Sequence, residues 1–316
     1  MVLVQNLSGF VVGKVTKRSR FGMDQARRTV ESARWCARFG MGFHLIDAEW
    51  RENYPGPREL AAILSHTESL DPSLRTIVTV SARHTDSMRR IAEYVEASKG
   101  HNMGLNIVAG NKAYLSLQER GRSPAKALSM TVRHVRGLWP GGMVLIGAEG
   151  LLETAMRLAA RFDLIPFLLM DKGLEDSVGR IRDEVGGCPI AVYAPFLISE
   201  SEDVSLIVLR SLYGYVLRRG WVRDAVMDLG YEPEGLGRRI GEMSVEQIRG
   251  MRPRLRGLLL EAVSRLSIAG DQGHVVAGLR RLKRLNVGMA AMLPIAERVD
   301  QIRMMGECAS RLRDPA

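Results

Sequence analysis

Cysteine is scarce in this sequence of 316 residues, which contains three copies that lie far apart. Cys36, Cys188 and Cys308 form no C-x-x-C pair, and an odd number of thiols cannot all be paired. The spacing therefore indicates neither a disulfide framework nor a cysteine-based metal site. We interpret all three as buried thiols, and we expect no bound metal.

Long apolar runs are also absent. No segment approaches the roughly 20 apolar residues that a membrane helix requires, and the first residues lack the charged, apolar and small-residue zones of a secretory signal. We therefore expect a cytoplasmic protein that does not bind membranes. Apolar residues make up 46% and charged residues 25% of the chain, a balance that predicts a compactly folded globular protein.

Basic residues exceed acidic ones, and the formal net charge of +10 raises the question of a nucleic-acid partner. The arginines lie on predicted outer helix faces among Glu and Asp, as in residues 26–40 and 237–257. They are not interleaved with the aromatic residues that a single-strand binder uses. This pattern favours a solvated surface over nucleic-acid binding.

Short apolar or β-branched runs alternate with segments at helical spacing, which is typical of repeated β-α units and a parallel sheet. Eight strands are predicted, beginning at Met1, Gly42, Leu74, Met103, Gly142, Leu164, Pro189 and Asn286. Helices are predicted over residues 24–39, 57–69, 86–99, 124–138, 151–162 and 174–185. Eight such units are the number at which a parallel sheet closes into a (β/α)8 TIM barrel.

Residues 204–285 depart from this alternation, because they show helical spacing and no predicted strand. We interpret them as a helical excursion between the seventh and eighth strands of a single domain that spans residues 1–316. An open, doubly wound sheet is the alternative fold. Its dinucleotide fingerprint G-x-G-x-x-G does not follow the first predicted strand, which favours the barrel.

The stretch "VLIGAEGLLETAMRLAARFD", residues 144–163, runs from a predicted strand through Gly147 and Gly150 into a helix. Free N–H groups at a helix N-terminus attract anions, and glycine lets a phosphate approach the backbone closely. Glycine is also common at such turns for conformational reasons alone. Phosphate binding and a purely structural turn both remain open on this evidence.

Three segments in order resemble the luciferase-like oxidoreductases: residues 104–139, the "VLIGAEG" turn and residues 191–220. Within that superfamily the chain looks most like the methylenetetrahydromethanopterin reductases, which use the deazaflavin coenzyme F420. "AGNKA" is similar to the family's glycine turn before Asp-Lys-Ala, and "GAEG" to its Gly-Ala-Gln-Gly turn. Residues 265–293 resemble the closing segment and last strand. The resemblance covers most of the chain and is loosest before residue 100.

The resemblance implies a luciferase-like barrel whose coenzyme lies across the C-terminal ends of the strands, an end that we call the barrel mouth. It places the coenzyme's phosphate at the backbone of Gly147, Ala148, Glu149 and Gly150. The remaining coenzyme contacts that we expect are Asn106, Gly110 and Asn111, where the fourth strand meets the coenzyme ring, and Ser81, Arg83 and His84, which close the third strand. A lone histidine at a strand end can also be purely structural or face solvent.

Asp47 follows the second predicted strand, where the family also carries an aspartate. It could orient the substrate or transfer a proton as the catalytic residue, or it could form only a cap or loop hydrogen bond. Glu49 and Trp50 would line the substrate pocket or cover its rim. At the end of the first predicted strand the family's carboxylate is replaced by Gln5, which is therefore a substrate-side candidate.

Gln5 and Asn111 both replace carboxylates, and an amide can orient a ligand but cannot act as a general acid or base.

The sequence and the resemblance leave three functions open. The leading one is an F420-dependent oxidoreductase acting on a one-carbon pterin or another small electrophile. The others are an FMN-dependent two-component monooxygenase and a non-catalytic flavin- or deazaflavin-binding protein. The apolar spacing of residues 204–217 suits either a homodimer interface or the barrel wall.

Overall fold

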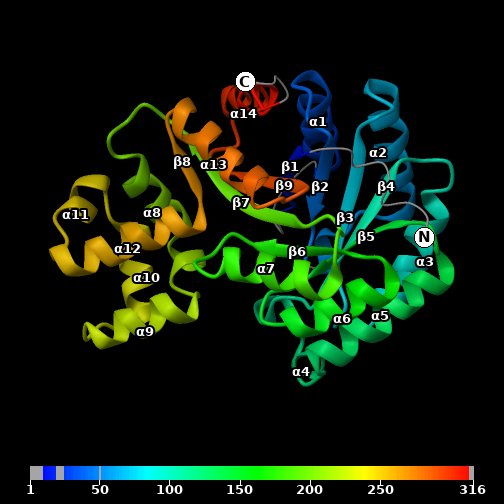
Figure 1. Cartoon of the computed structure of the whole chain (residues 1–316), viewed down its shortest axis with the longest axis horizontal. Helices are drawn as coiled ribbons and strands as arrows, with labels where there is room; N and C mark the ends of the chain where they lie inside the picture. Colours follow the sequence, from blue (N-terminus) through cyan, green and yellow to red (C-terminus); the bar gives the residue numbers. More distant parts are fainter. Residues whose placement is uncertain (1–9, 19–24, 50, 313–316) are drawn as a thin grey trace. The chain divides into compact units, whose positions relative to one another are not determined.

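A closed ring of parallel strands is the centre of the fold in the computed structural model, which describes residues 10–18, 25–49 and 51–312 (Figure 1). The sheet order is β6-β5-β4-β3-β2-β1-β9-β7-β8, and a further pairing between β6 and β7 closes the ring. The strands are β1 (Val11–Lys17), β2 (Phe43–Asp47), β3 (Arg75–Ser81), β4 (Met103–Val108), β5 (Met143–Gly147), β6 (Ile165–Leu169), β7 (Ala191–Ile198), β8 (Ile268–Gly270) and β9 (Met289–Pro294).

Eight of these strands form the barrel, because β8 pairs only with the last residues of β7, outside the ring. Closure is completed where the carbonyl of Ile190, just before β7, accepts hydrogen bonds from the N–H groups of Gly288 and Met289 at 2.9 and 3.1 Å. The predicted (β/α)8 barrel is therefore confirmed.

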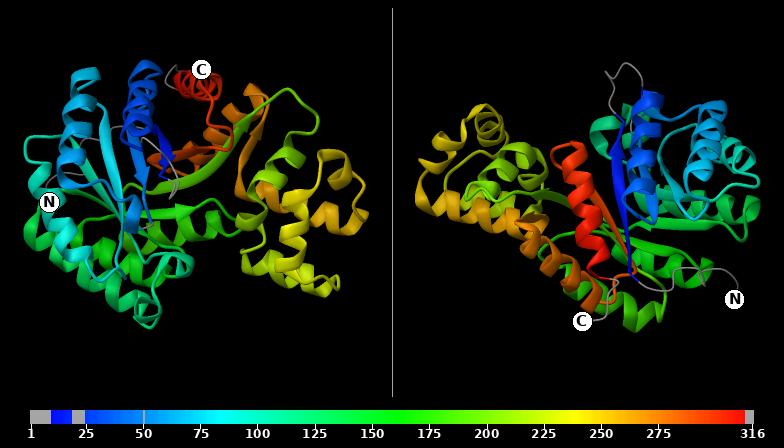
Figure 2. Two further views of the ribbon diagram at one scale, coloured as in Figure 1. Left: turned by 180° about the vertical axis from the view of Figure 1, so that it is seen from behind. Right: turned by 90° about the horizontal axis from the view of Figure 1, so that it is seen from above.

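The predicted helices are found within one or two residues of their expected ends, outside the ring of strands (Figures 1 and 2). They are α1 (Gln25–Arg38), α2 (Pro57–Leu70), α3 (Ser87–Ala97), α5 (Pro124–Leu138), α6 (Leu152–Phe162) and α7 (Leu174–Val185). Proline in the first turn of α2 and α5 and the serine cap of α5 mark their starts, as sequence signals predict. None of the described helices has the length and apolar character needed to cross a membrane.

The first barrel strand differs from the predicted one. The strand predicted from Met1 lies outside the described residues, and the strand that pairs with both β2 and β9 is β1, "VVGKVTK". Gln5 therefore does not stand at the end of the first barrel strand, where the structure has Lys17. β1 escaped prediction because Gly13 and Lys14 interrupt its apolar pattern. Gly13 is needed there, since the Phe43 ring lies 2.4 Å from where a Cβ would be.

The chain divides into two compact units. The first comprises residues 1–169, 173–193 and 282–292 and contains the barrel. The second comprises residues 170–172, 194–281 and 293–316. Its helices are α8 (Val204–Val216), α9 (Gly220–Asp228), α10 (Pro233–Glu242), α11 (Val245–Arg249), α12 (Pro253–Leu266), most of α13 (Gln272–Arg284) and α14 (Val299–Ser310).

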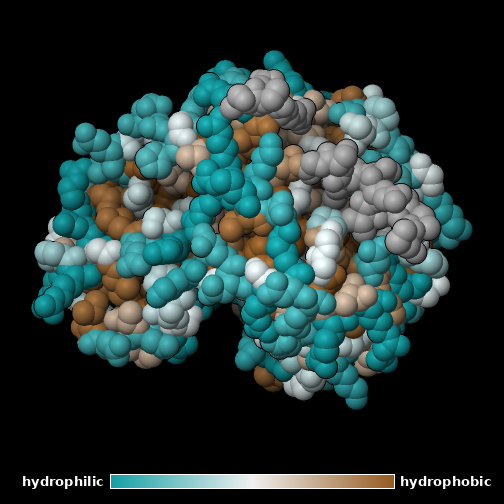
Figure 3. Space-filling model, in the orientation of Figure 1, coloured by the Kyte–Doolittle hydropathy of each residue, from teal (hydrophilic) through white to brown (hydrophobic). Residues whose placement is uncertain are grey.

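The second unit has a hydrophobic core of its own, which includes Val208, Ile240 and Leu259, all fully buried. The excursion predicted as wholly helical also contains a strand, because β8 pairs in parallel with Phe196–Ile198 of β7. With three residues, β8 is too short to produce a recognisable period-two pattern. Hydrophilic residues cover most of the face shown in Figure 3, with apolar areas between them.

Candidate functional site

The barrel interior near the mouth is lined by polar side chains from neighbouring strands. Strand residues alternate between two faces, and contacts to helices identify the outer one: Lys14 donates to Ser32 of α1 at 2.5 Å, and Thr76 donates to Thr67 of α2 at 3.4 Å. The strand register then places the alternate residues on the inner face. Near the mouth these are Lys17, Asp47, Thr79, Ser81, Asn106, Phe167 and Tyr193.

Contacts across the interior support this assignment. The Lys17 Nζ atom lies 6.0 Å from the centroid of the Tyr193 ring, and the Phe167 and Tyr193 rings meet edge to face at 6.2 Å between centroids. On the other side, Asn106 Nδ2 donates to Thr79 Oγ1 at 3.1 Å. A cation, two aromatic rings and an amide therefore face the same space.

Asp47, the predicted catalytic residue, lies at the end of β2 beside Lys17 in the strand register. Its side chain is half-buried, and no described residue donates a hydrogen bond to its carboxylate. Burial raises the pKa of Asp47, and the positive charge of Lys17 offsets only part of that rise. A carboxyl group in this state is suited to hold or donate a proton.

Two buried polar atoms on the inner face of β3 and β4 have no hydrogen-bond partner among the described residues. They are Ser81 Oγ and Asn106 Oδ1, and their residues are 0% and 2% exposed. Gly110 has a φ of +93°, and a Cβ there would lie 2.0 Å from Ser81 Oγ. The loop after β4 can approach Ser81 only because residue 110 is glycine.

Arg83 and Asn111 stabilise that loop. Arg83 Nε donates to the carbonyl of Ala109 at 2.8 Å, and its terminal nitrogen donates to that of Gly110. Asn111 Oδ1 accepts from the N–H of Ala113 at 3.0 Å and so caps η2 (Lys112–Tyr114). Both side chains therefore support the backbone next to the predicted coenzyme position.

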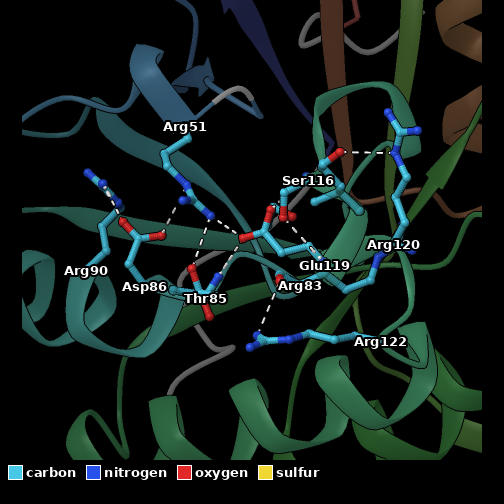
Figure 4. Close-up of polar contacts among 12 residues, drawn as sticks. Arg51, Arg83, Thr85, Asp86, Arg90, Ser116, Glu119, Arg120 and Arg122 are labelled. Atoms are coloured by element: carbon cyan, nitrogen blue, oxygen red, sulfur yellow. Dashed lines mark hydrogen bonds and ion pairs between the residues drawn. The ribbon is translucent and has the colours of Figure 1, made fainter.

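Glu119 joins three loops of the mouth (Figure 4). It is 2% exposed and lies on α4 (Leu117–Arg120). Its Oε1 accepts from the Arg51 guanidinium of η1 (Arg51–Asn53) and from the N–H of Thr85 at 2.8 Å, while Oε2 accepts from the N–H of Ser116 at 3.0 Å. The segments after β2, β3 and β4 are thus bound to one carboxylate.

His84 belongs to the same region. Its ring meets the Tyr54 ring edge to face at 5.6 Å, and neither ring nitrogen has a partner among the described residues. Burial lowers the pKa of His84, and the nearby Glu119 charge offsets part of that effect. The Tyr54 hydroxyl oxygen accepts from the N–H of Ser81 at 2.7 Å, which connects this cluster to the end of β3.

The predicted phosphate turn has the expected backbone. β5 ends at Gly147, the N–H of Leu151 donates to the carbonyl of Ala148 at 3.0 Å, and α6 follows without a side-chain cap. Gly150 is exposed with a φ of +64°, and no atom lies within 4 Å of where its Cβ would be. Glu149 is also exposed. The turn therefore has open space beside glycine backbone.

The structure places the other predicted residues of the barrel interior and the substrate side as follows. Ser81, Asn106 and Asp47 lie on the inner face, and Gly110 meets Ser81. Glu49 is half-buried and close enough to Tyr54 to influence its pKa. Gln5 and Trp50 lie outside the described residues.

Lys17, Tyr193, Tyr54 and Glu119 were missed by the sequence reasoning. Lys17 could have been found only with the correct first strand. Glu119 carried a signal, because Ser116 and Glu119 have the S-x-x-E spacing of a capping box, which the structure contains. No group of three or more His, Cys, Asp or Glu that could hold a metal ion occurs in the described ranges.

Comparison with models of protein families shows the family to which the chain belongs. The model of a family of unknown function, DUF7388, matches residues 22–302, so the chain belongs to that family. No curated protein matches the sequence.

Three solved structures with a similar fold are a dehydrogenase and two monooxygenases. An F420-dependent secondary alcohol dehydrogenase in complex with an F420–acetone adduct has a TM-score of 0.66 at 11% identity, covering 97% of this chain and 100% of that one. An EDTA monooxygenase from Chelativorans sp. has a TM-score of 0.60 at 14% identity, covering 97% and 95%. A type II Baeyer–Villiger monooxygenase of Pseudomonas putida in complex with FMN has a TM-score of 0.61 at 12% identity, covering 95% and 97%. These similarities support the (β/α)8 barrel as the fold.

Proposed function

We propose that the barrel mouth binds a flavin-type coenzyme and that the protein is an oxidoreductase. The coenzyme that we propose is F420, with a one-carbon pterin or another small electrophile as the second substrate. One observation carries the proposal: Ser81 Oγ and Asn106 Oδ1 face the barrel interior without hydrogen-bond partners in the described structure.

These atoms fit the ring of such a coenzyme. A buried polar atom left unpaired costs about 1–3 kcal/mol, so a partner is expected to reach it. The ring system of a flavin or deazaflavin carries amide-type N–H and C=O groups along one edge. Asn106 Oδ1 can accept from such an N–H, and the Ser81 hydroxyl can donate or accept. When bound there, the coenzyme would supply or accept a hydride.

The protein would supply position and one proton. Asp47, whose half-buried carboxyl group lies beside Lys17 on the inner face, would lie next to the reacting group and transfer the proton. Arg83 would fix the loop that carries Gly110, and the coenzyme's phosphate would lie beside Gly150 at the start of α6, which has no side-chain cap. His84, together with Asn111, would border the coenzyme from the loops after β3 and β4.

FMN is the alternative coenzyme, since one structure of similar fold was solved with FMN and another with an F420 adduct. Fold alone does not separate the two. Titration of the purified protein with each coenzyme, followed by fluorescence, distinguishes them.

The ring position is tested with Ser81→Ala and Asn106→Leu. Each change removes one of the unpartnered atoms, so coenzyme affinity should fall by about tenfold, or roughly 1.4 kcal/mol. Thr76→Val is the matched control, because Thr76 is equally buried on β3 but its hydroxyl contacts Thr67 on the outer face. Equal loss in the control would refute the proposed ring position.

The phosphate position is tested with Gly150→Val, whose side chain would fill the open space of the turn. Gly100→Val is its control, because Gly100 also has positive φ, +84°, and no atom within 4 Å of a Cβ. Both variants should lose about 1–2 kcal/mol of stability from backbone strain. Only Gly150→Val should weaken coenzyme binding, by about tenfold or more. Equal affinities of the two variants would place the phosphate elsewhere.

A further inference from the structure

An ammonium group stands inside the barrel mouth at the end of the first strand. Lys17 is exposed, and its Nζ atom lies over the Tyr193 ring at 6.0 Å from the centroid. Tyr193 is on β7 and Lys17 on β1, so the side chain extends across the inner face of the ring. In the described part of the chain its ammonium forms no hydrogen bond and no close ion pair.

The surroundings of this ammonium favour a bound anion. Each barrel helix begins after the C-terminal end of a strand, so the positive ends of the helix dipoles lie toward the mouth. Asp47 is the carboxyl group next to Lys17 in the strand register. Burial raises the pKa of Asp47, which is the direction that weakens its compensation of the Lys17 charge.

We propose that Lys17 binds a carboxylate or another oxyanion of the substrate, beside Asp47. This inference rests on the proposed function, since it assigns the substrate side of the same mouth. The ammonium has three N–H donors for the oxyanion, and the Tyr193 ring holds the cation from its other side. The substrate class is thus a small electrophile that carries an oxyanion, with Asp47 positioned to donate a proton to the group that is reduced.

Binding of malonate and of inorganic phosphate, measured by calorimetry at constant ionic strength, tests the anion site without any coenzyme. Wild type should bind malonate saturably, and Lys17→Met should weaken the affinity by about tenfold or more. Lys17→Arg keeps the charge and should stay within about threefold of wild type. Lys126→Met, which removes an exposed lysine of α5, should not change the affinity. Circular dichroism confirms that each variant is folded.

Two results would overturn the anion site: wild type that binds neither anion, or equal affinity of wild type and Lys17→Met. Titration of the same variants with F420 and FMN separates this inference from the proposed function. Unchanged coenzyme affinity in Lys17→Met supports a substrate oxyanion, whereas a tenfold loss would assign Lys17 to the coenzyme and overturn the substrate class. If neither coenzyme binds wild type while malonate still distinguishes the variants, the proposed function is wrong and the anion site stands.

Discussion

The Glu119 carboxylate links the segments after β2, β3 and β4 at the mouth. Burial alone would raise its pKa, but hydrogen bonds from the N–H groups of Ser116 and Thr85 and the Arg51 charge lower it below the usual value. A depressed carboxylate pKa stabilises the fold above its unfolded value of 4.5, and this contribution disappears as the pH falls through the folded pKa. Ionised Glu119 thus stabilises the loops at neutral pH.

Glu119→Gln should lower the free energy of unfolding by about 2–3 kcal/mol at pH 7, because the charged hydrogen bonds are lost. The difference from wild type should shrink as the pH falls below about 4.5. Urea denaturation at several pH values measures both. Glu153→Gln is the control, since Glu153 pairs with Arg180 on the surface at 64% exposure and should change stability little. A pH-independent difference would show that the charge of Glu119 contributes nothing.

Asp47 should show the opposite pH dependence. Its pKa is raised in the folded state, so the folded protein binds more protons than the unfolded chain above pH 3.8, and stability falls as the pH rises through the folded pKa. The Asp47→Asn substitution removes the titrating group and therefore this loss of folding stability at higher pH. The variant should therefore gain stability relative to wild type as the pH rises through the range above about 4, as followed by chemical denaturation. A gain that is constant across this range would contradict the raised pKa.

At the residue level the sequence could predict which side chains follow each strand, but not what they contact. Ser81 was identifiable from its place at the end of an apolar run, and Asn106 as the polar residue within the next one. The pairing of Lys17 with Asp47 depends on the register between β1 and β2, and that register is set by packing of the whole barrel.

β1 shows the same limit at the level of one element. Six strands from β2 to β7 have near-continuous apolar runs because both faces are covered, and these were predicted. β1 has the sequence "VVGKVTK", in which Lys14 lies between the barrel and α1 over the Trp35 ring, 5.6 Å from its centroid. A buried lysine breaks the apolar pattern that identifies strands, so β1 was missed. As a result, Gln5 was predicted at the end of the first strand, where the structure has Lys17.

Gly13→Ala tests how tightly β1 and β2 pack. An added Cβ would lie 2.4 Å from the Phe43 ring, so the ring or the strand must shift, at a cost of about 1–3 kcal/mol. Gly137→Ala is the control, because residue 137 has open space around its Cβ in the helix α5. There alanine should be neutral or stabilising. Thermal denaturation measures the stability of both variants relative to wild type. If Gly13→Ala were as stable as Gly137→Ala, the close packing of Phe43 on Gly13 would be contradicted.

At the scale of the whole molecule, each compact unit has its own set of buried apolar side chains. Leu259→Ala would remove a fully buried side chain from the core of the second unit, at a cost of about 2–5 kcal/mol. Amide hydrogen exchange should then increase in α8, α10 and α12 more than in β3, β4 and β5. A uniform increase would indicate that the two units unfold together.

Seven of the eight predicted strands coincide with barrel strands, and the number of repeated β-α units was enough to predict the closed barrel. The core of the second unit was not predictable in the same way. Its helices have apolar faces at helical spacing, but spacing does not show which faces pack on one another, as Val208 of α8, Ile240 of α10 and Leu259 of α12 do.

Equilibrium dialysis of the wild-type protein against F420, and separately against FMN, tests most directly whether the barrel is a coenzyme-binding oxidoreductase. We expect retention of about one equivalent of F420 per chain, detected as a single violet-blue absorption band, with FMN as the alternative recognised by its two bands. Retention of neither coenzyme would contradict the proposed function and leave the unpaired Ser81 and Asn106 atoms to another ligand.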